Sequence, residues 1–419
     1  MAGGPPTDDK GRLLADLVLR NAGELVTMTR PAREGLGVLA GGALAAYEGT
    51  IVWVGREADL AGSVGLAAEA VELDAQGACV LPGFVDCHTH AVFAGERAAE
   101  YGERLAGVSY LDLLQRGVGI RLTVVATRAA SERELAELTA RRLDSFLAHG
   151  TTTLEIKSGY GLSAEDEAKQ LRAATVPHPV RRSLTFCGAH FVPPEYEGRA
   201  DAYVESVCAD QLPVCAPLAE WCDVFCDEGA FTVAQARRVL EAAREHGLGL
   251  RLHAEELAHT GAAALGAELG CASADHLILA TDDDMAALRA AGTVAVLLPG
   301  TSYTLHAGYA PARAFLDAGV VVALASDFNP GSSYCENMQM VISLACQELR
   351  LTPDEALWAA TAGGAAALRL TGQVGVLAPG AACDLVVLDA ATRAELPYHY
   401  GVNLVDGVVV GGKPADEAS

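Results

Sequence analysis

Two histidines spaced two residues apart are the first feature of this sequence that could do chemistry. His88 and His90 end the stretch 81–90, an apolar run that reads Leu-Pro-Gly-Phe-Val-Asp-Cys-His-Thr-His. In a β-strand, residues i and i+2 point to the same side, so both imidazoles are expected on one face. Imidazole nitrogen is a common ligand for zinc and related metals. The pair predicts half of a metal site; the alternative is a pair of exposed or core-bonded histidines.

Other polar residues also come where apolar runs finish. The full set of such candidates is His88, His90, Tyr160, His190, His253, Glu256, His276 and Asp327. Each of them alone has a structural explanation, because helix caps and satisfied buried polar groups are commoner than ligands. Their joint occurrence at the ends of successive runs favours one shared site.

Eight apolar runs separated by helical stretches must position these residues. The runs are 83–90, 151–158, 183–190, 222–227, 249–254, 273–277, 293–298 and 320–327. This alternation is typical of parallel βαβ units, and eight strands close a barrel whose active site lies at the carboxyl ends of the strands. Capping-box pairs that start helices are Ser131 with Glu134, Thr232 with Gln235, and Thr352 with Glu355. An open doubly wound sheet is the alternative architecture, but no glycine-rich dinucleotide motif follows the first run.

Short β-like runs near both ends of the chain predict a second, discontinuous unit. Runs at 17–19, 45–47, 51–55 and 71–73 are matched by runs at 380–388 and 402–410. We therefore expect an α/β protein in which a TIM-like (β/α)8 barrel over residues 81–372 carries a small β-sandwich subdomain. Residues 1–80 and 373–419 would form that subdomain together.

The composition limits the partners and the compartment. Among 419 residues, 54 are acidic and 30 basic, a formal net charge of −24 that repels nucleic acid and anionic membranes. The first residues carry no secretory signal, and no apolar run is long enough to span a bilayer. Eleven cysteines without a C-x-x-C pair predict reduced thiols. We expect a cytoplasmic protein with no nucleic-acid and no membrane partner.

The candidate residues resemble the amidohydrolase superfamily, with H-x-H on strand one, histidines on strands five and six, and an aspartate on strand eight. A longer set of motifs resembles the imidazolonepropionase family of histidine degradation. These motifs lie at 93–97, 107–111, 127–128, 157–162, 188–190, 192–196, 274–277, 297–301, 327–333 and 397–403. The resemblance implies a (β/α)8 barrel with a small β-sandwich, and hydrolysis of the cyclic amide of 4-imidazolone-5-propanoate to N-formimidoyl-L-glutamate. We also expect a homodimer.

The resemblance also implies a role for each candidate residue. The expected metal ligands are His88, His90, His253 and Asp327. In catalysis, Asp327 would accept a proton from water, His276 would stabilise the carbonyl oxygen, and Glu256 would deliver a proton to the ring nitrogen. The expected substrate contacts are Arg97, Tyr110, Tyr160, His190, Glu256, Asn329, Gly331 and Ser332. Arg97 is the natural fork for the propionate carboxylate.

One metal ion is expected rather than two. Superfamily members with two metals commonly bridge them with a carboxylated lysine or a glutamate on strand four. The run 222–227 has no lysine, and Lys157 lies on strand two. We therefore expect one zinc or iron ion per chain. The chain departs from the family pattern at Ala94, Glu96 and 117–119, which flank the substrate loop and bear on affinity rather than on the reaction.

Two other functions are compatible with the pattern. A deaminase of cyclic amidines such as guanine or cytosine shares the His-x-x-Glu pair, here His253 and Glu256. A non-catalytic scaffold with the same fold is the alternative from another class, but such proteins lose metal ligands, whereas all four candidates are present.

Overall fold

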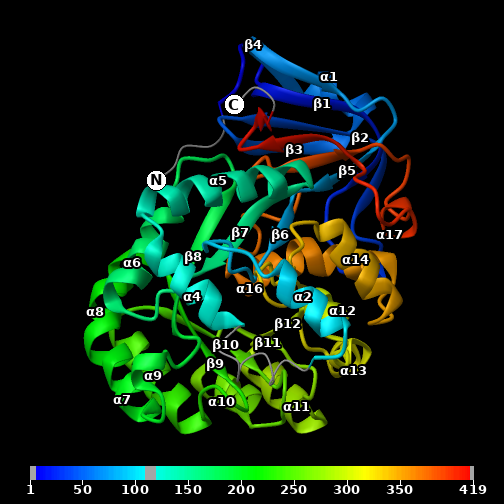
Figure 1. Cartoon of the computed structure of the whole chain (residues 1–419). Coiled ribbons are helices and arrows are strands. Elements are labelled where there is room, and N and C mark those ends of the chain that lie inside the picture. The colour runs from blue at the N-terminus through cyan, green and yellow to red at the C-terminus, as the bar shows by residue number, and fades with distance from the viewer. Residues whose placement is uncertain (1–5, 109–118, 416–419) are drawn as a thin grey trace.

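A ring of eight parallel strands forms the centre of the molecule. The computed structural model describes residues 6–108 and 119–415 (Figure 1). The strands of the ring are β6 (Phe84–Asp86), β7 (Thr151–Lys157), β8 (Arg181–Ala189), β9 (Trp221–Cys226), β10 (Gly249–Ala254), β11 (Ser273–His276), β12 (Val294–Leu297) and β13 (Val322–Leu324). They follow one another in chain order around the sheet, each hydrogen-bonded in parallel to the next. Each of the eight predicted runs overlaps one of these strands, although the bounds of β6 and β13 differ from those expected.

The ring closes beyond the ends of its first and last strands. Thr89 forms a parallel bridge with Phe328. The backbone N–H of His90 donates to the Phe328 carbonyl over 2.9 Å, and that of Asp327 donates to the His88 carbonyl over 3.0 Å. Closure therefore fixes the segments that carry the candidate metal ligands, because the same backbone bonds that complete the barrel hold those residues.

Most helices surround the ring, the first helix packs on the N-terminal strands, and three helices start at capping boxes predicted from the sequence. The helices are α1 (Glu57–Ser63), α2 (Ala98–Leu105), α4 (Ile120–Ala129), α5 (Glu132–Ala148), α6 (Ala164–Ala173), α7 (Ala200–Ser206), α8 (Leu212–Cys215), α9 (Val233–Glu245), α10 (Ala262–Leu269), α11 (Asp282–Ala291), α12 (Pro299–Leu305), α13 (Ala312–Ala318), α14 (Met338–Gln347), α15 (Pro353–Trp358), α16 (Gly364–Ala367) and α17 (Glu395–Tyr398). The three predicted capping boxes open α5, α9 and α15. Short 3-10 or π turns lie at η1 (Ala32–Glu34), η2 (Pro194–Tyr196), η3 (Val207–Gln211), η4 (Ala216–Leu218) and η5 (Ala359–Gly363).

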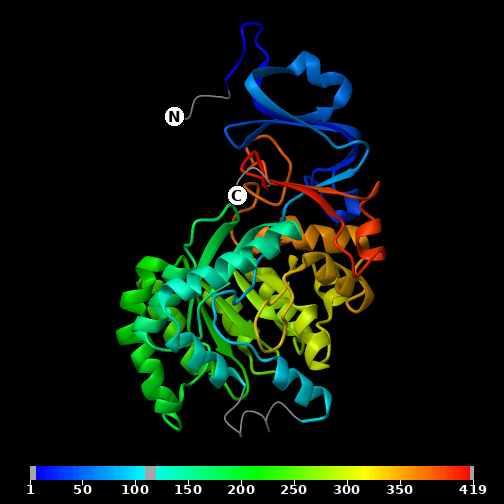
Figure 2. The ribbon, with the colours of Figure 1, turned by 45° about the horizontal axis from the view of Figure 1, so that its top comes forward.

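Segments from both ends of the chain build a second, mixed sheet. Its strands are β1 (Leu13–Val26), β2 (Val38–Tyr47), β3 (Thr50–Arg56), β4 (Val64–Asp74), β5 (Cys79–Pro82), β14 (Leu385–Leu388), β15 (Val405–Val410) and β16 (Lys413–Pro414). The two ends meet where β14 pairs antiparallel with β5, with Val386 opposite Leu81. Figures 1 and 2 show this sheet at one end of the barrel, with the blue and red segments side by side. β5 spans the domain boundary predicted at residues 80 and 81, and the exact boundaries stay a prediction.

Successive side chains of β1 in the terminal sheet pack into two different apolar clusters. Leu17 and Leu19 face one apolar cluster, whereas Val18 between them faces another. Both clusters are separate from the main barrel cluster. The terminal sheet therefore has apolar clusters of its own, as expected from the short apolar runs near both ends.

Two strand predictions were wrong in length, and the difference matters for the site. The run 83–90 was expected to be one strand, but β6 ends at Asp86, so His88 and His90 lie beyond the strand rather than on its face. Likewise β13 ends at Leu324, three residues before Asp327, which has a φ of 51°. Barrel closure takes over the backbone bonds at these positions. The ligand segments are therefore shaped by contacts between the first and last strands.

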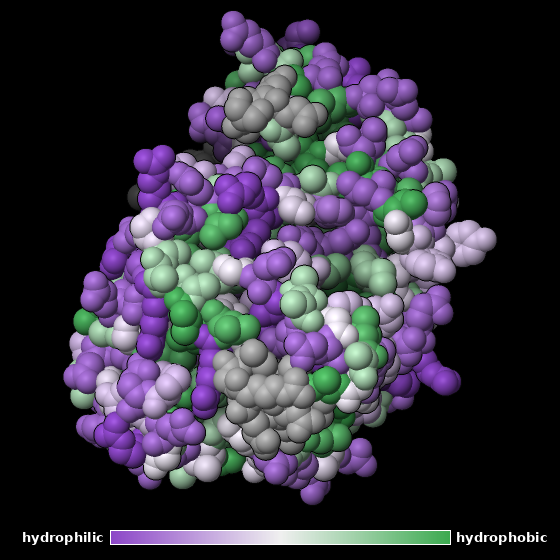
Figure 3. Space-filling view, in the orientation of Figure 1, coloured by the Kyte–Doolittle hydropathy of each residue, from purple (hydrophilic) through white to green (hydrophobic). Residues whose placement is uncertain are grey.

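The surface and the thiols agree with the composition. Hydrophilic side chains cover most of the face drawn in Figure 3, with apolar ones in small groups. All eleven cysteines are free. Within residues 6–108 and 119–415, no helix combines the length and apolar character needed to cross a membrane.

Candidate active site

Three histidines meet at the carboxyl end of the barrel. His88 and His90 follow β6, and His253 lies near the end of β10. One nitrogen from each ring lies within 4.8 Å of the others, and the residues are at most 3 % exposed. The Nε2 atoms of His253 and His90 are 3.4 Å apart. The structure thus brings together three of the four residues predicted as metal ligands.

Asp327 supplies a carboxylate to the same point. Its Oδ1 lies 3.5 Å from His88 Nε2 and 3.9 Å from His90 Nε2. Its Oδ2 accepts a hydrogen bond from the Thr301 hydroxyl. Burial raises the pKa of Asp327 to about 6. A nearby cation would favour the ionised carboxylate.

Each of these histidines is oriented through its Nδ1 atom. Nδ1 of His88 lies 2.6 Å from Asp275 Oδ2, and Nδ1 of His253 lies 2.7 Å from Asp223 Oδ1. His90 makes a longer contact of 3.4 Å with the Ser158 carbonyl oxygen. An ionised carboxylate or a carbonyl can only accept, so each ring carries a proton on Nδ1 and turns Nε2 toward the shared point. In each ring the inward-facing atom is therefore Nε2, the nitrogen that can bind a metal.

This donor set fits a divalent cation. The Nε2 atoms of His253 and His90 lie close enough for both to reach one cation. Burial opposes a charge on His253, yet Asp223 raises its pKa, and a bound cation would replace the extra proton on Nε2. His88 Nε2 is buried, with no hydrogen-bond partner among the described residues. Burial lowers the pKa of His88 and of His90 well below the usual value, so both rings are neutral. Three imidazoles and one carboxylate suit zinc, and iron accepts similar ligands.

Lys157 lies beneath the ligands as an ion-paired ammonium. Its Nζ is 2.7 Å from Asp223, 2.8 Å from Glu155 and 3.6 Å from Asp275, and all four residues are 0 % exposed. Burial opposes the charge, yet Asp223 and Glu155 raise the pKa of Lys157 above its ordinary value. A lysine must lose its proton to be carboxylated. Its surroundings therefore disfavour Lys157 as a metal-bridging ligand.

Sequence reasoning gave no role to Asp223 and Asp275. Both are acidic residues inside otherwise apolar strands, at inward positions of β9 and β11. Asp223 stands two positions before Phe225, in the strand that pairs with the β10 strand carrying His253. A charged residue at an inward strand position was the available signal, because such a residue needs a buried partner.

A cavity of 470 Å3 opens in front of the histidines. Its walls include most of the predicted site residues: His90, Arg97, Tyr160, His190, His253, Glu256, His276, Asp327, Asn329, Gly331 and Ser332. Tyr101, Leu105, Phe191 and Leu257 give the outer wall an apolar character. The predicted contact Tyr110 lies outside the described residues. So do residues 117 and 118 of the segment 117–119, where the chain departs from the family pattern.

Glu256 and His276 are neighbours in the wall of this cavity. Glu256 Oε2 lies 3.6 Å from His276 Nε2. The backbone of Glu256 is held by Asp227, whose Oδ2 accepts its N–H over 2.7 Å. Burial, followed by the charge of Asp327, raises the pKa of Glu256 to about 8, so at neutral pH this carboxyl carries a proton. Burial lowers the pKa of His276 well below its ordinary value, and the ring is a neutral donor.

Arg97 lies in the cavity wall in a buried pair that the sequence did not predict. Its Nε donates to Glu100 Oε2 over 2.7 Å, and Nη2 donates to Glu100 Oε1. Both residues are less than 10 % exposed. A Cβ atom at Gly331 would clash with Arg97 Nη1. Glycine at 331 thus leaves room for the guanidinium, whose orientation Glu100 fixes.

His190 and Tyr160 form one side of the cavity. The His190 ring stacks on His90 with centroids 4.7 Å apart and planes 10° apart. Its Nδ1 is 3.0 Å from the Gly159 carbonyl oxygen. Tyr160 meets His190 edge-on at 5.4 Å. The stack leaves Nε2 of His190 as the atom available to a ligand, because Nδ1–H already donates to backbone.

The loop after β13 is organised by Asn329. Its Oδ1 accepts the backbone N–H groups of Gly331 and Ser332, each over 2.8 Å. Its Nδ2 donates to the Asp327 carbonyl and to Ser332 Oγ. Asn329 thereby uses its amide group within the loop, and it shapes the backbone that Gly331 and Ser332 present to the cavity.

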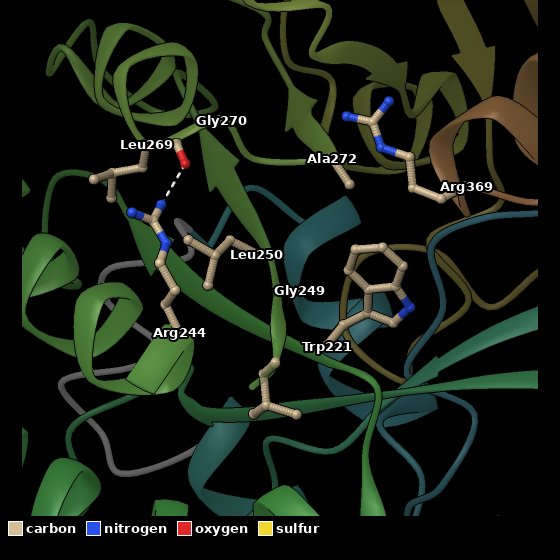
Figure 4. A pocket seen from close by; sticks show the side chains of 9 residues that line it. Trp221, Arg244, Gly249, Leu250, Leu269, Gly270, Ala272 and Arg369 are labelled. Carbon is tan, nitrogen blue, oxygen red and sulfur yellow. Dashed lines mark hydrogen bonds between the residues drawn. The ribbon is translucent and has the colours of Figure 1, made fainter. Parts of the chain in front are cut away.

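A second cavity, of 320 Å3, lies at the opposite end of the barrel strands (Figure 4). Trp221 and Gly249, the first residues of β9 and β10, line it together with Arg244 and Arg369. Arg244 donates to the Leu269 carbonyl. Among the described residues, its walls hold no carboxylate, imidazole, hydroxyl or thiol side chain. It lacks the groups needed for hydrolysis, and the histidine-lined cavity is the candidate active site.

Comparisons with known proteins agree with this geometry. The model of the amidohydrolase family matches residues 79–415. Imidazolonepropionase of Symbiobacterium thermophilum is 49 % identical over 410 residues, which are 95 % of this chain and 96 % of that relative. Imidazolonepropionase of Salinispora tropica is 48 % identical and covers 96 % of this chain and 99 % of its own. An adenosine deaminase from Xanthomonas campestris, solved with bound zinc, superposes with a TM-score of 0.73 at 22 % identity, covering 98 % of this chain and 93 % of its own. That structure supports the fold.

Proposed function

The chain belongs to the amidohydrolase family and, within it, to the imidazolonepropionases, and we propose that it opens the ring of 4-imidazolone-5-propanoate. Water adds to the ring carbonyl, the amide C–N bond breaks, and N-formimidoyl-L-glutamate is released in the degradation of L-histidine. The observation that carries this proposal is the convergence of His88, His90, His253 and Asp327 on one point. Proton-carrying groups and an arginine line the adjacent cavity.

The metal-ligand residues define where the attacking water belongs. We propose that His88, His90, His253 and Asp327 hold one zinc or iron ion. When bound, such an ion lowers the pKa of water to about 7 and polarises a carbonyl. Asp327 has one oxygen toward the histidines and is placed to take the proton of the attacking water.

The remaining groups complete the hydrolysis. Neutral His276 donates a hydrogen bond where negative charge develops on the carbonyl oxygen. Glu256 carries a proton below about pH 8 and gives it to the departing ring nitrogen. Arg97, fixed by Glu100, offers its guanidinium to the propionate, with His190 and Tyr160 beside it. Tyr110, Asn329, Gly331 and Ser332 stay proposed substrate contacts, with Asn329 acting through the loop that it holds.

A coupled assay tests this function directly. Urocanase generates the unstable imidazolone in the cuvette, and the purified chain should accelerate its disappearance while N-formimidoyl-L-glutamate accumulates. Guanine and cytosine should not be deaminated. Deamination without imidazolone hydrolysis would overturn the proposal in favour of a cyclic amidine deaminase, which the named relatives do not favour. Absence of both activities in metal-loaded protein would favour a scaffold. The homodimer and the cytoplasmic location stay predictions.

Metal analysis should give about one equivalent of zinc or iron per chain. The physical reason is that the described residues offer one cluster of ligands with free lone pairs, while Lys157 is committed to its ion pairs. A second group, Glu255 with His259 and Asp284, is already satisfied: Glu255 accepts three backbone N–H groups, and His259 bonds Asp284. Plasma emission after dialysis measures the ratio. Two tightly held ions per chain would contradict the mononuclear site.

Arg97→Met should lower kcat/KM for imidazolone propionate at least about tenfold. A hydrogen bond to a charged group is worth roughly 1.5–3 kcal/mol, and the variant loses the carboxylate fork. The substitution also leaves the buried Glu100 carboxylate without Arg97. The matched control is therefore the double variant Arg97→Met with Glu100→Gln, in which that carboxylate is replaced by a neutral amide. Steady-state kinetics should show the same loss in both variants, with metal content unchanged. Wild-type kcat/KM in the double variant would show that Arg97 does not bind the propionate.

A further inference from the structure

The two carboxylate oxygens of Asp327 contact different neighbours. Oδ1 faces the Nε2 atoms of His88 and His90. Oδ2 accepts the hydroxyl hydrogen of Thr301, a residue of α12 that is 1 % exposed. We propose that Thr301 is a positioning residue, which holds the Asp327 carboxylate so that Oδ1 alone faces the histidines and the attacking water. This inference rests on the proposed hydrolysis and adds a residue to which no role was given.

The backbone of Asp327 is fixed independently of Thr301. Its N–H donates to the His88 carbonyl over 3.0 Å, and its carbonyl accepts from Asn329 Nδ2 over 2.7 Å. These contacts set the position of the Cα atom and the φ of 51°. They do not set the rotation of the carboxylate about the Cβ–Cγ bond, because neither involves its oxygens. The Thr301 hydroxyl acts on that rotation through its bond to Oδ2, and the Asn329 side chain is a second, weaker neighbour of the carboxylate.

Helix α12 is built to bring the Thr301 hydroxyl to this place. Pro299 opens the helix, and the Thr301 N–H donates to the Leu298 carbonyl over 3.2 Å. A Cβ atom at Gly300 would lie 2.8 Å from Ser333 Oγ, so the glycine lets α12 approach the loop that carries Asp327. Ser333 Oγ in turn donates to the Ser326 carbonyl over 2.7 Å. The helix start and the loop thus form one packed unit around the Thr301–Asp327 bond.

Positioning and simple packing predict opposite results for two substitutions. Thr301→Val keeps the shape of the side chain and removes the hydroxyl, whereas Thr301→Ser keeps the hydroxyl and removes the methyl group. If Thr301 only fills space, serine should be the damaging change. If its hydroxyl positions Asp327, valine should be damaging and serine should restore the wild-type behaviour.

The experiment measures kcat, KM and zinc affinity for the wild type, Thr301→Val and Thr301→Ser. Zinc affinity is obtained by competition with a fluorescent chelator on metal-free protein. We expect valine to lower kcat ten- to about a hundredfold, the range that a hydrogen bond to a charged group corresponds to, with KM within about twofold. The zinc Kd should rise about tenfold. Serine should stay within about threefold of the wild type in both quantities.

Two outcomes overturn the inference: wild-type kcat and zinc Kd in the valine variant, or equal losses in valine and serine. If the valine variant does not fold, Thr301→Ala is compared with Thr301→Ser, since these two differ in the hydroxyl alone. If the wild type itself fails to open the imidazolone ring, the proposed function fails. The order of zinc affinities, with serine equal to wild type and valine weaker, still reports on Thr301 in that case.

Discussion

Asp327→Asn should lower kcat at least about a thousandfold in metal-loaded protein while the fold is retained. General acid–base groups typically contribute roughly 10²–10⁴-fold, and an asparagine side chain could neither take the proton of the attacking water nor supply negative charge. The position of Asp327 supports this size of effect, since its Oδ1 is within 3.9 Å of both His88 and His90. Steady-state kinetics, metal analysis and thermal unfolding of the same preparation measure the three quantities.

The matched control is Asp283→Asn, at an exposed position in the first turn of α11. It makes the same chemical change at a residue that does not line the cavity, and its kcat should equal that of the wild type. Near-normal turnover of the Asp327→Asn variant, with a full complement of metal, would remove Asp327 from the reaction.

Glu256→Gln should lower kcat by at least about a hundredfold and abolish the alkaline limb of the pH profile. Burial and then the charge of Asp327 raise the pKa of Glu256 to about 8. The carboxyl is therefore protonated below about pH 8 and loses its proton as the pH rises. In the proposed mechanism Glu256 gives this proton to the ring nitrogen, so wild-type activity should fall above that pH. Glutamine cannot release a proton, so its residual activity should not follow this titration.

Glu228→Gln is the control for this prediction. Glu228 is exposed and lines the same cavity. Its backbone N–H donates a hydrogen bond to Asp227 Oδ1, and its carboxylate takes no part in that bond. The variant should keep both the turnover and the alkaline limb. A Glu256→Gln enzyme that retained the limb at the same pH would assign that titration to another group.

Local sequence determined the elements of this protein. Each capping box, such as Ser131 with Glu134, joins residues three apart, and all three formed as predicted. Each barrel strand is a short apolar run that is recognisable without its partners, and β10 has the predicted bounds. The polar residues that end these runs converge on one cavity because parallel strands bring their carboxyl ends to one face. Local patterns were sufficient to predict these site residues, because the barrel places the ends of all its strands at one face.

Tertiary structure decided how these residues are held. His88 bonds Asp275, 187 positions away, and Lys157 bonds Asp223, 66 positions away. Closure through Thr89 and Phe328 ended β6 early, so His88 lies beyond the strand. Such pairs depend on strand register and on which face of each strand turns inward, which single runs do not encode. The sequence by itself therefore determined which groups reach the site, and only the packed barrel determined their tautomers, charges and orientations.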